Sequence, residues 1–429
     1  IDDDPYKWGA NINNLKIFSS DLTNKIIQKN KIKKIIIAIG GLTENKKLNI
    51  LNKINNNIID IVFLDLDKNQ NIKERKFNYE LIQNKKLKIK TPKNLLITHS
   101  TILITGAGGS IGSQICLQLI YYKPKKIILY DNSEYNIFKL SQKIDSFIKR
   151  YNILGTEIVT YIDSIQDYKV LEEVFIKHSP SIVMHTAAYK HVSINQKNIN
   201  SIFRNNVLGT LNLLKLSVNQ DCKDFLLIST DKAVNPTTVM GATKRIAELL
   251  TLGFNNKNSF LKTTVVRFGN VLNSTGSVIP IFEEQIKKGG PITVTDKDVS
   301  RYFITIQDAV MLVLESLNIS NGGEIFVLKM GKPIKILDIA KKLIVQNGLS
   351  LKNTKNPNGD IEIKITGLKQ GEKKHEELFI NKQSKLTSHT DILQSNEEID
   401  YIKVSKLIIN DIANKEFYDD TFINHIFKK

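Results

Sequence analysis

Cysteine is scarce in this sequence, and long apolar runs are missing from it. Among 429 residues there are two cysteines, Cys116 and Cys222, and neither lies in a CxxC pattern. This argues against a disulfide framework and against a zinc site built on paired cysteines. No stretch reaches the roughly 18 consecutive apolar residues that a membrane-spanning helix needs, and no signal peptide is recognisable. We therefore expect a soluble chain from a reducing compartment such as the cytoplasm.

Positive charge is in excess, but it is spread out. The 61 lysines and arginines outnumber the 43 aspartates and glutamates, which gives a formal net charge of +18. Nucleic-acid-binding proteins gather such residues with aromatic side chains on one face, whereas the lysines here are distributed along the whole chain. We expect no nucleic-acid partner. The charge instead favours encounters with small anionic molecules, such as a diphosphate.

Hydrophobic patterning divides the chain into three parts. Residues 1–94 contain two apolar, β-branched runs, at 33–41 and 58–66, which predict a small α/β domain with a parallel sheet. Residues 95–275 alternate strand-like and helix-like segments, which predicts the doubly wound parallel sheet of a dinucleotide-binding (Rossmann) domain. Residues 276–429 are more irregular, and we interpret them as mainly a substrate-binding region.

A glycine-rich loop marks the start of the second part. The run "ITGAGGSIGSQI" places Gly106, Gly109 and Gly112 directly between an expected strand and an expected helix, with Ser110 and Ile111 among them. Such a loop lets backbone N–H groups approach a pyrophosphate, and the helix N-terminus adds a favourable dipole. The strand–loop–helix context predicts a dinucleotide-binding site.

The next expected strand ends in an acidic residue. Asp131 follows the glycine loop at about the 20-residue offset of the carboxylate that binds the adenosine ribose, and Asn132 lies beside it. A carboxylate accepts hydrogen bonds from a ribose 2′-hydroxyl and repels a 2′-phosphate, so we predict NAD rather than NADP. Asp131 can also cap the helix that begins at Glu134. Asp163, at the end of the third strand, is a candidate for contact with the adenine.

The candidate catalytic residues follow the strand "DFLLIST". This strand delivers Thr230, Asp231 and Lys232 to the carboxyl edge of the sheet, where such sheets bind ligands. On the next helix, Met240 and Lys244 are four residues apart and share a face. Their spacing resembles the Tyr–Lys pair of short-chain dehydrogenases, but a thioether cannot take a proton. Residue chemistry alone leaves open a dinucleotide-binding scaffold without catalysis, and an interpretation of "STDK" as a helix-capping turn.

These motifs together resemble the UDP-N-acetylglucosamine 4,6-dehydratases of bacterial glycan biosynthesis, in their long, membrane-associated form within the extended short-chain dehydrogenase superfamily. The similarity extends from Leu95 to Phe379 and weakly to the start of the chain. Long-form members have Met at the tyrosine position, so Met240 fits the family. The passages that carry the resemblance are "TGAGGSIGSQ", "HTAAYKHV", "NNVLGTLNLL", "VRFGNVLNSTGSVIPIF", "SRYFITIQDAV" and "GLKQGEKKHEEL".

The resemblance implies a reaction with several proton transfers. NAD would take a hydride from C4 of the sugar and return it to C6, while water leaves across C5 and C6. Lys232 is the candidate base at C5, a role that requires burial and the neighbouring Lys244 to lower its pKa. Asp231 is the candidate acid at the C6 hydroxyl, and Thr230 the candidate partner of the C4 oxygen. The acceptor of the C4 hydroxyl proton stays open between Asp231 and a Thr230–water relay.

The implied product is the UDP-4-keto-6-deoxy sugar, a precursor of rare amino sugars in surface glycans. We expect the C5 configuration to be retained, because C5-inverting relatives resemble the short form that carries tyrosine. A C5-inverting dehydratase and a C4 epimerase are the rival enzymes, although epimerases normally lack the Asp–Lys pair. The rival from another class is the non-catalytic NAD(H)-binding scaffold.

The resemblance also assigns the surroundings of the cofactor and the substrate. Ala187 and Ala188 would let the cofactor approach closely, and Asn206, expected to open a helix, would lie near the nicotinamide. We interpret His185 as a satisfied strand residue and expect no metal site, because no second ligand has suitable spacing. The residues matched to the UDP-sugar pocket are Lys190, His191, Arg267, Asn270, Ser277, Arg301, Lys369 and Glu372.

Within that pocket, Arg301 is the candidate ligand of the diphosphate, because a planar guanidinium suits phosphate oxygens. The chain departs from the family's Arg-Pro at Lys369 and Gln370, which keeps a charge but loses the planar fork. Glu372 and Glu376 would orient the ribose or uracil, or else cap a helix.

The resemblance further bears on partners and location. Family members self-associate, so we expect a homo-oligomer that binds UDP-N-acetylglucosamine. The chain begins at Ile1 rather than Met, and a longer parent protein would carry an N-terminal membrane anchor. Its catalytic part would then lie at the cytoplasmic face of the inner membrane.

Overall fold

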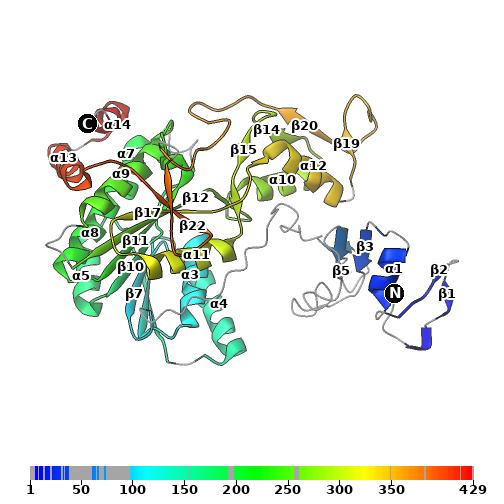
Figure 1. Ribbon diagram of the computed structural model, residues 1–429, viewed down its shortest axis with the longest axis horizontal. Helices are drawn as coiled ribbons and strands as arrows, with labels where there is room; N and C mark the ends of the chain where they lie inside the picture. Colours follow the sequence, from blue (N-terminus) through cyan, green and yellow to red (C-terminus); the bar gives the residue numbers. More distant parts are fainter. Residues whose placement is uncertain are drawn as a thin grey trace. The chain divides into compact units, whose positions relative to one another are not determined.

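The computed structural model describes residues 97–427 apart from 154, 192–197, 256–259, 348, 381–382 and 416. Of the first 96 residues it describes 5–7, 9–12, 15–19, 22–29, 32, 34–37, 60–63, 65–66 and 72–73. The chain forms two compact units, residues 1–78 with 346–348 and residues 79–345 with 349–429 (Figure 1). All the predicted site residues belong to the second unit.

The first unit contains short elements. Its strands β3 (Lys34–Ile37) and β4 (Asp60–Phe63) pair in parallel, which confirms the parallel arrangement expected for these two apolar runs. The remaining elements are η1 (Pro5–Lys7), β1 (Asn11–Ile12), β2 (Leu15–Lys16), α1 (Thr23–Lys29), β5 (Asp65–Leu66) and β6 (Ile72–Lys73). The predicted boundary between residues 94 and 95 lies outside the described residues.

The second unit is built on a sheet with the strand order β21-β22-β17-β12-β11-β10-β7-β8-β9. The strands from β17 to β9 are parallel, and β22 and β21 add antiparallel at one edge. The chain reverses its direction of progress between β7 and β10, as in a doubly wound dinucleotide-binding sheet, so the predicted fold class is confirmed. The strands are β7 (Thr101–Thr105), β8 (Lys126–Asp131), β9 (Glu157–Ile162), β10 (Ile182–His185), β11 (Asp224–Thr230), β12 (Lys262–Phe268), β17 (Glu324–Leu328), β21 (Ser384–Leu386) and β22 (Ile392–Ser395).

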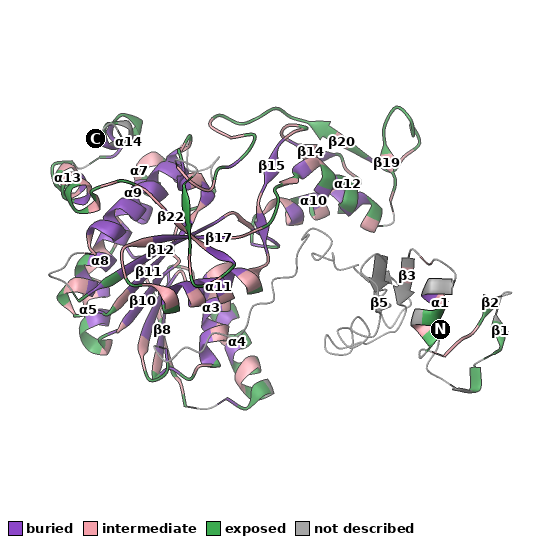
Figure 2. Ribbon diagram, in the orientation of Figure 1, coloured by how far each residue is buried: buried purple, intermediate pink, exposed green. Residues whose placement is uncertain are grey.

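Helices cover both faces of this sheet, because its central strands are apolar on both sides (Figure 2). Leu103 and Val183 pack into the cluster formed with α5 (Tyr168–His178), α8 (Gly209–Asn219) and α9 (Val239–Gly253). Ile104 and Met184 point to the other face, with α3 (Ser110–Ile120), α4 (Glu134–Tyr151) and α11 (Ile306–Ile319). No helix among the described residues is long and apolar enough to cross a bilayer.

The helix α9 lies at the centre of one layer. Every one of its residues is buried, because α13 (Tyr401–Ala413) and α14 (Asp420–Phe427) pack over it as well as α8. The C-terminal helices therefore belong to the core that holds the candidate catalytic helix.

The helix before β11 begins earlier than the sequence predicted. It runs from α7 (Ile199–Phe203) through the π-helical turn η4 (Arg204–Leu208) into α8. The expectation that Asn206 opens this helix is wrong, because the buried Ile202 and Phe203 add an apolar turn that packs in the core.

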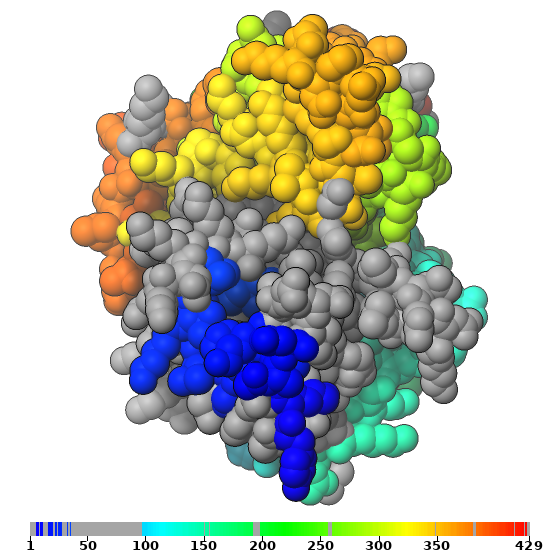
Figure 3. Space-filling model, turned by 90° about the vertical axis from the view of Figure 1, so that its right-hand side faces the viewer, coloured from blue at the N-terminus to red at the C-terminus, as the bar shows by residue number. Residues whose placement is uncertain are grey.

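A smaller lobe follows β12, and Figure 3 shows much of it in yellow-green to orange. Its parallel sheet has the order β14-β20-β19. Its elements are β13 (Asn270–Val271), α10 (Val278–Lys287), β14 (Ile292–Val294), β15 (Ser300–Arg301), β16 (Phe303–Ile304), β18 (Ile334–Lys335), α12 (Ile336–Gln346), β19 (Leu351–Lys352) and β20 (Ile361–Ile365).

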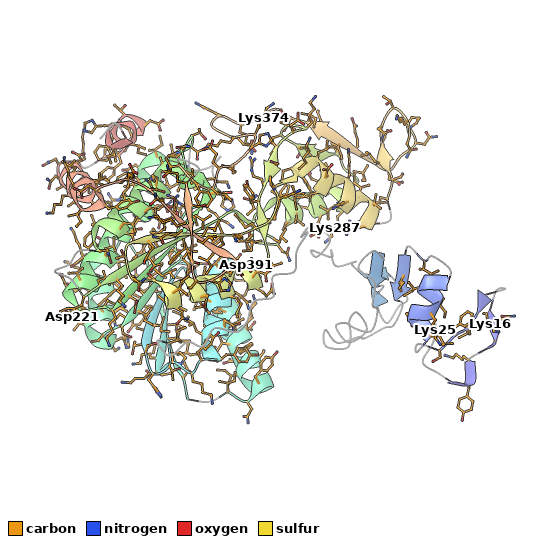
Figure 4. All side chains as sticks on the ribbon, viewed as in Figure 1. Lys16, Lys25, Asp221, Lys287, Lys374 and Asp391 are labelled. Carbon is orange, nitrogen blue, oxygen red and sulfur yellow. The ribbon has the colours of Figure 1, made fainter. Side chains whose placement is uncertain are left out.

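The segment after β20 contains no helix over residues 366–380. Lys374, labelled in Figure 4, ties it to the lobe through a 3.2 Å ion pair with Asp296. Arg301 donates to the backbone oxygen of Lys374 at 3.1 Å. The alternative that Glu372 and Glu376 cap a helix is therefore wrong, because the residues around them form no helix.

A buried network of ions lies behind β11. Glu248 of α9 accepts two hydrogen bonds from Arg267, at 2.7 and 2.6 Å, one from Arg245 at 3.0 Å and one from Ser229 at 2.7 Å. Glu397 pairs with both arginines, at 2.6 and 2.8 Å. Burial alone would raise the pKa of Glu248, but the guanidinium groups of Arg267 and Arg245 lower it to about 2. The network joins β11, β12 and α9 to the C-terminal segment.

We predict that Glu248→Ala lowers the free energy of unfolding by about 3–5 kcal/mol, because it leaves two buried guanidinium groups with one carboxylate between them. Urea unfolding followed by circular dichroism measures this loss. Glu284→Ala is the control, since Glu284 pairs with Lys288 at 2.6 Å on the surface and its removal should leave the stability nearly unchanged. Similar losses in both variants would contradict the prediction.

Candidate active site

The loop between β7 and α3 brings the backbone very close to its neighbours. Gly106 has φ +65°, and a Cβ there would lie 2.7 Å from the Cα of Ala187. A Cβ on Gly112 would lie 2.3 Å from the oxygen of Gly106. Gly109 caps α3 without a side-chain hydrogen bond. The loop therefore offers backbone N–H groups and the positive end of a helix to a ligand.

Asp131 orders the turn that follows β8. Its carboxylate accepts hydrogen bonds from the N–H groups of Gly108 and Ser133, each at 2.9 Å. The residue that caps α4 is Ser133, which accepts from Asn136, so the interpretation of Asp131 as the helix cap is wrong. Each carboxylate oxygen can accept a second hydrogen bond, and the contact of Asp131 with a ribose stays a prediction.

An open cavity of about 930 Å³ lies at the carboxyl edge of the sheet. It is lined by the glycine loop, the end of β11, α9, residues from both sides of β13 and the segment after β20. Gly108 of the glycine loop and Thr275 also line it, although neither was among the predicted site residues. The predicted residues that line it are Gly106, Gly109, Ser110, Ile111, Gly112, Ala188, Lys190, His191, Thr230, Lys232, Met240, Lys244, Asn270, Ser277, Arg301, Lys369 and Glu372.

Other predicted residues do not line this cavity: Asp131, Asn132, Asp163, Ala187, Asn206, Asp231 and Arg267. Asn132 is exposed. The carboxylate of Asp163 accepts from the N–H of Ser164 at 2.6 Å, so it orders its own turn. The adenine contact of Asp163 stays a prediction.

Lys232 lies among carboxylates rather than beside a second lysine. Its ammonium donates to Asp231 at 2.9 Å and to the side-chain oxygen of Asn270 at 3.2 Å, and it lies 3.7 Å from Glu376. Burial opposes its charge, but Asp231 and Glu376 outweigh burial and raise the pKa of Lys232. The expectation that Lys244 and burial lower this pKa is wrong, because the two acidic partners dominate.

Asp231 is completely buried. One oxygen of its carboxylate accepts from Lys232 and from the hydroxyl of Thr230, both at 2.9 Å. The other oxygen has no hydrogen-bond partner. Asp231 therefore binds Thr230 and Lys232 from the protein interior, whereas these two residues line the cavity.

Met240 and Lys244 both line the cavity, as expected for residues four apart on one helix. The ammonium of Lys244 donates to the backbone oxygen of Ile228 at 2.7 Å. Burial lowers the pKa of Lys244 to about 8, although Glu248 opposes the shift. Lys244 is thus fixed by the strand that carries the other candidate catalytic residues.

Arg267 was predicted to contact the substrate, and this prediction is wrong. Its side chain is fully buried in the ion network with Glu248 and Glu397. On β12 it pairs in register with Ser229 of β11. The adjacent Asn270 does reach the cavity, where it accepts from Lys232.

Arg301 enters the cavity with its guanidinium already engaged by the protein. It donates to Glu372 at 3.1 Å and to the backbone oxygen of Ser300 at 2.8 Å. Its Nε lies 3.8 Å from Glu376, a carboxylate that also lines the cavity. Glu372 also accepts a hydrogen bond from the N–H of Lys369. A diphosphate at Arg301 would therefore share this guanidinium with acidic neighbours.

Asn206 acts as a clamp rather than as a cavity residue. Its side chain accepts from the N–H of Tyr189 at 2.8 Å and donates to the oxygen of Tyr189 and to the hydroxyl of Thr243, each at 3.1 Å. Asn206 is buried and joins the loop after β10 to α9, and its predicted position near the nicotinamide stays a prediction.

A bridge of hydrogen bonds at the edge of the cavity joins Lys190, Thr275 and Ser110, which belong to three different loops. The ammonium of Lys190 donates to the backbone oxygen of Thr275 at 2.9 Å. The hydroxyl of Ser110 lies 3.4 Å from that of Thr275 and accepts from its N–H at 3.3 Å. Nearby, His191 packs against Gly276, and the hydroxyl of Ser277 is buried without a hydrogen-bond partner.

His185 is a satisfied residue of β10, as predicted. Its ring nitrogens contact the hydroxyls of Thr105 at 2.7 Å and Thr210 at 2.9 Å. Burial lowers the pKa of His185 well below its usual value. Among the described residues, no group of three or more His, Cys, Asp or Glu side chains is arranged to hold a metal ion.

Comparison with known proteins agrees with this arrangement. The capsular polysaccharide biosynthesis protein CapD of Staphylococcus aureus is 40% identical over 408 residues, 91% of this chain and 65% of that protein. A Campylobacter jejuni protein named UDP-N-acetylglucosamine 4,6-dehydratase (inverting) is 32% identical over 296 residues, 68% of this chain and 81% of that protein. The chain thus spans less than two thirds of the length of CapD.

A solved structure is similar over about three quarters of the chain. The X-ray structure of Pen from Bacillus thuringiensis has a TM-score of 0.60 and 32% identity, and it covers 74% of this chain and all of that one. The family model described as "Polysaccharide biosynthesis protein" matches residues 102–397. This range includes the glycine loop, the candidate catalytic strand and the cavity. The chain therefore belongs to the polysaccharide biosynthesis protein family.

Proposed function

We propose that this chain catalyses the NAD-dependent 4,6-dehydration of UDP-N-acetylglucosamine, with the C5 configuration retained. The observation that carries the proposal is the position of Lys232, which faces the same cavity as Lys244 and the glycine loop. A dehydratase needs proton-transferring groups beside a hydride acceptor, and with NAD bound at the glycine loop this cavity would hold both. A plain dehydrogenase has no use for the Asp231–Lys232 pair.

The residues around the glycine loop fit NAD. Gly106 and Gly112 allow the loop to pack tightly on itself and on the loop after β10, because a Cβ at either position would meet neighbouring backbone atoms at 2.7 and 2.3 Å. Gly108 donates its N–H to Asp131 and so fixes the course of the loop, and the N-terminus of α3 would face a pyrophosphate. Asp131 would hold the adenosine ribose and Lys244 the nicotinamide ribose. When bound, NAD takes a hydride from C4 of the sugar and returns it to C6.

Thr230 and Lys232 would then carry out the proton transfers at C4 and C5 of the sugar. Thr230 would donate to or accept from the C4 oxygen. Lys232 can accept the C5 proton only after passing its own proton to a neighbouring carboxylate, because Asp231 and Glu376 keep it charged. Lys190 and Arg301 supply positive charge for a diphosphate.

The relatives support the choice of substrate. The Campylobacter jejuni protein is named for UDP-N-acetylglucosamine 4,6-dehydration, and CapD for capsular polysaccharide biosynthesis. The word "inverting" in the name of the Campylobacter jejuni protein favours inversion at C5. Met240 in place of tyrosine favours retention at C5. A C4 epimerase is the second candidate, and it would leave C6 hydroxylated.

We predict that incubation with NAD and UDP-N-acetylglucosamine yields a product lighter by one water, detected by mass spectrometry. Proton NMR of the product should show a C6 methyl group and give the C5 configuration. An isomer of unchanged mass would identify an epimerase. Tight NAD binding with unchanged substrate would instead identify a non-catalytic scaffold.

We predict that Lys232→Ala lowers the dehydration rate by about 10²-fold or more, because it removes the proton-transferring ammonium. Calorimetric binding of NAD and UDP should be preserved. Lys232→Gln can still donate a hydrogen bond to Asp231, so it tests whether the loss in Lys232→Ala comes from misfolding. Lys335→Ala is the matched lysine control, because Lys335 forms a surface ion pair with Asp298. Undiminished turnover in the Lys232 variants would refute the role.

We predict that Asp131→Ala weakens the preference for NAD over NADP, because the carboxylate no longer repels a 2′-phosphate. Dissociation constants for both dinucleotides measure this ratio. Asp145→Ala, at an exposed position of α4, is the control and should leave the ratio unchanged. An unaltered ratio in Asp131→Ala would count against the ribose contact.

A further inference from the structure

Glu376 reaches the site from a distant part of the chain. It belongs to the segment between β20 and β21, its side chain is 5% exposed, and it lines the cavity. Its Oε1 lies 3.7 Å from the ammonium of Lys232 and 3.8 Å from Nε of Arg301. Glu376 is therefore an acidic side chain that both contacts Lys232 and faces the space where a sugar would bind.

Asp231 cannot offer the same access. It is completely buried and does not line the cavity. One of its oxygens is occupied by Lys232 and Thr230. The other points toward Gly269, where a Cβ would lie 3.0 Å from it. A proton on Asp231 would have to pass through Lys232 or Thr230 to reach a ligand.

The charges around Lys232 favour protonation of Glu376, the carboxylate that lines the cavity. Burial raises the pKa of Glu376; Lys232 lowers it, and Asp231 raises it further. Two largely buried carboxylates that share one ammonium cannot both be ionised without cost, so the pair binds a proton more readily than an isolated carboxylate. Asp231 is held by two short hydrogen bonds, whereas Glu376 lies at the longer distance from Lys232.

We propose that Glu376, rather than Asp231, is the general acid that protonates the departing C6 hydroxyl. This inference rests on the proposed dehydration of a UDP-sugar. Asp231 is then a positioning residue, which holds Lys232 and Thr230 at the edge of the cavity. Glu376 becomes a third member of the catalytic group, supplied by the C-terminal part of the chain.

The elimination balances among Asp231, Lys232 and a Glu376 that starts as the carboxylic acid. Proton transfer from the Lys232 ammonium to Asp231, 2.9 Å away, gives a neutral amine. The amine takes the C5 proton of the 4-keto sugar, and the C5–H electron pair forms the C5=C6 double bond. The C6–O bond breaks, and the oxygen leaves as water with the proton of Glu376. Transfer of the Asp231 proton through Lys232 to Glu376 restores the starting state.

A fluorinated substrate separates acid catalysis from other roles. Fluoride leaves carbon as an anion without a proton, so UDP-N-acetylglucosamine with fluorine in place of the C6 hydroxyl needs the base but no acid. We expect Glu376→Gln to lower turnover of the natural substrate by about 10²–10⁴-fold and to retain most of its turnover of the fluorinated substrate, measured as fluoride release.

Two variants serve as comparisons. Glu372→Gln also borders the cavity and contacts Arg301, and it should affect both substrates equally and mildly. Asp231→Asn should slow both substrates, because an amide cannot take the proton of Lys232. If Glu376→Gln slows both substrates alike, or if the fluorinated substrate rescues Asp231→Asn instead, the assignment of Glu376 is overturned.

The same experiment distinguishes failure of the inference from failure of the proposed function. Wild-type enzyme that removes no water from UDP-N-acetylglucosamine would refute the function, and the assignment of Glu376 with it. If the wild type is active, the ratio of the two substrates in Glu376→Gln decides the acid. Formation of reduced cofactor on mixing the variant with the natural substrate shows that it still folds and oxidises C4.

Discussion

The site depends on the ion pair between Lys232 and Asp231. A fully buried carboxylate is stable only with a charged or strongly donating partner, so Asp231 fixes the ammonium at the end of β11. That ammonium in turn orients Asn270 and attracts Glu376. Groups from β11, β13 and the segment after β20 are thereby brought to one point, and the state of charge of each depends on the others.

A second set of charges supports the same strand from the opposite direction. Glu248 binds Ser229, the residue before Thr230, and it also lies one turn after Lys244 on α9. Glu397 extends this network into the chain that leads to α13. The C-terminal third therefore serves the core and the cavity together, and strands on both sides of residue 275 enter the same sheet.

Local patterns were sufficient to predict the main architecture. Strand and helix periodicities, the glycine loop and the Met240–Lys244 spacing depend on residues close in sequence, and the structure reproduces the elements that they indicate. Arg267 and Glu376 could not be assigned in this way. Whether an arginine on a strand faces a ligand or a buried glutamate depends on which helix packs behind it. Likewise, the charge of Lys232 depends on an acid contributed by a remote loop.

The bridge made by Lys190, Thr275 and Ser110 has a consequence for exchange at the cavity rim. It joins three loops through individually modest hydrogen bonds, at 2.9 to 3.4 Å, directly beside the glycine loop. These loops would have to separate for a molecule held beneath the bridge to leave on that side, so the bridge would lengthen the residence time of such a molecule. Slow escape would suit the proposed dehydration, in which the dinucleotide finishes each cycle in its starting oxidation state.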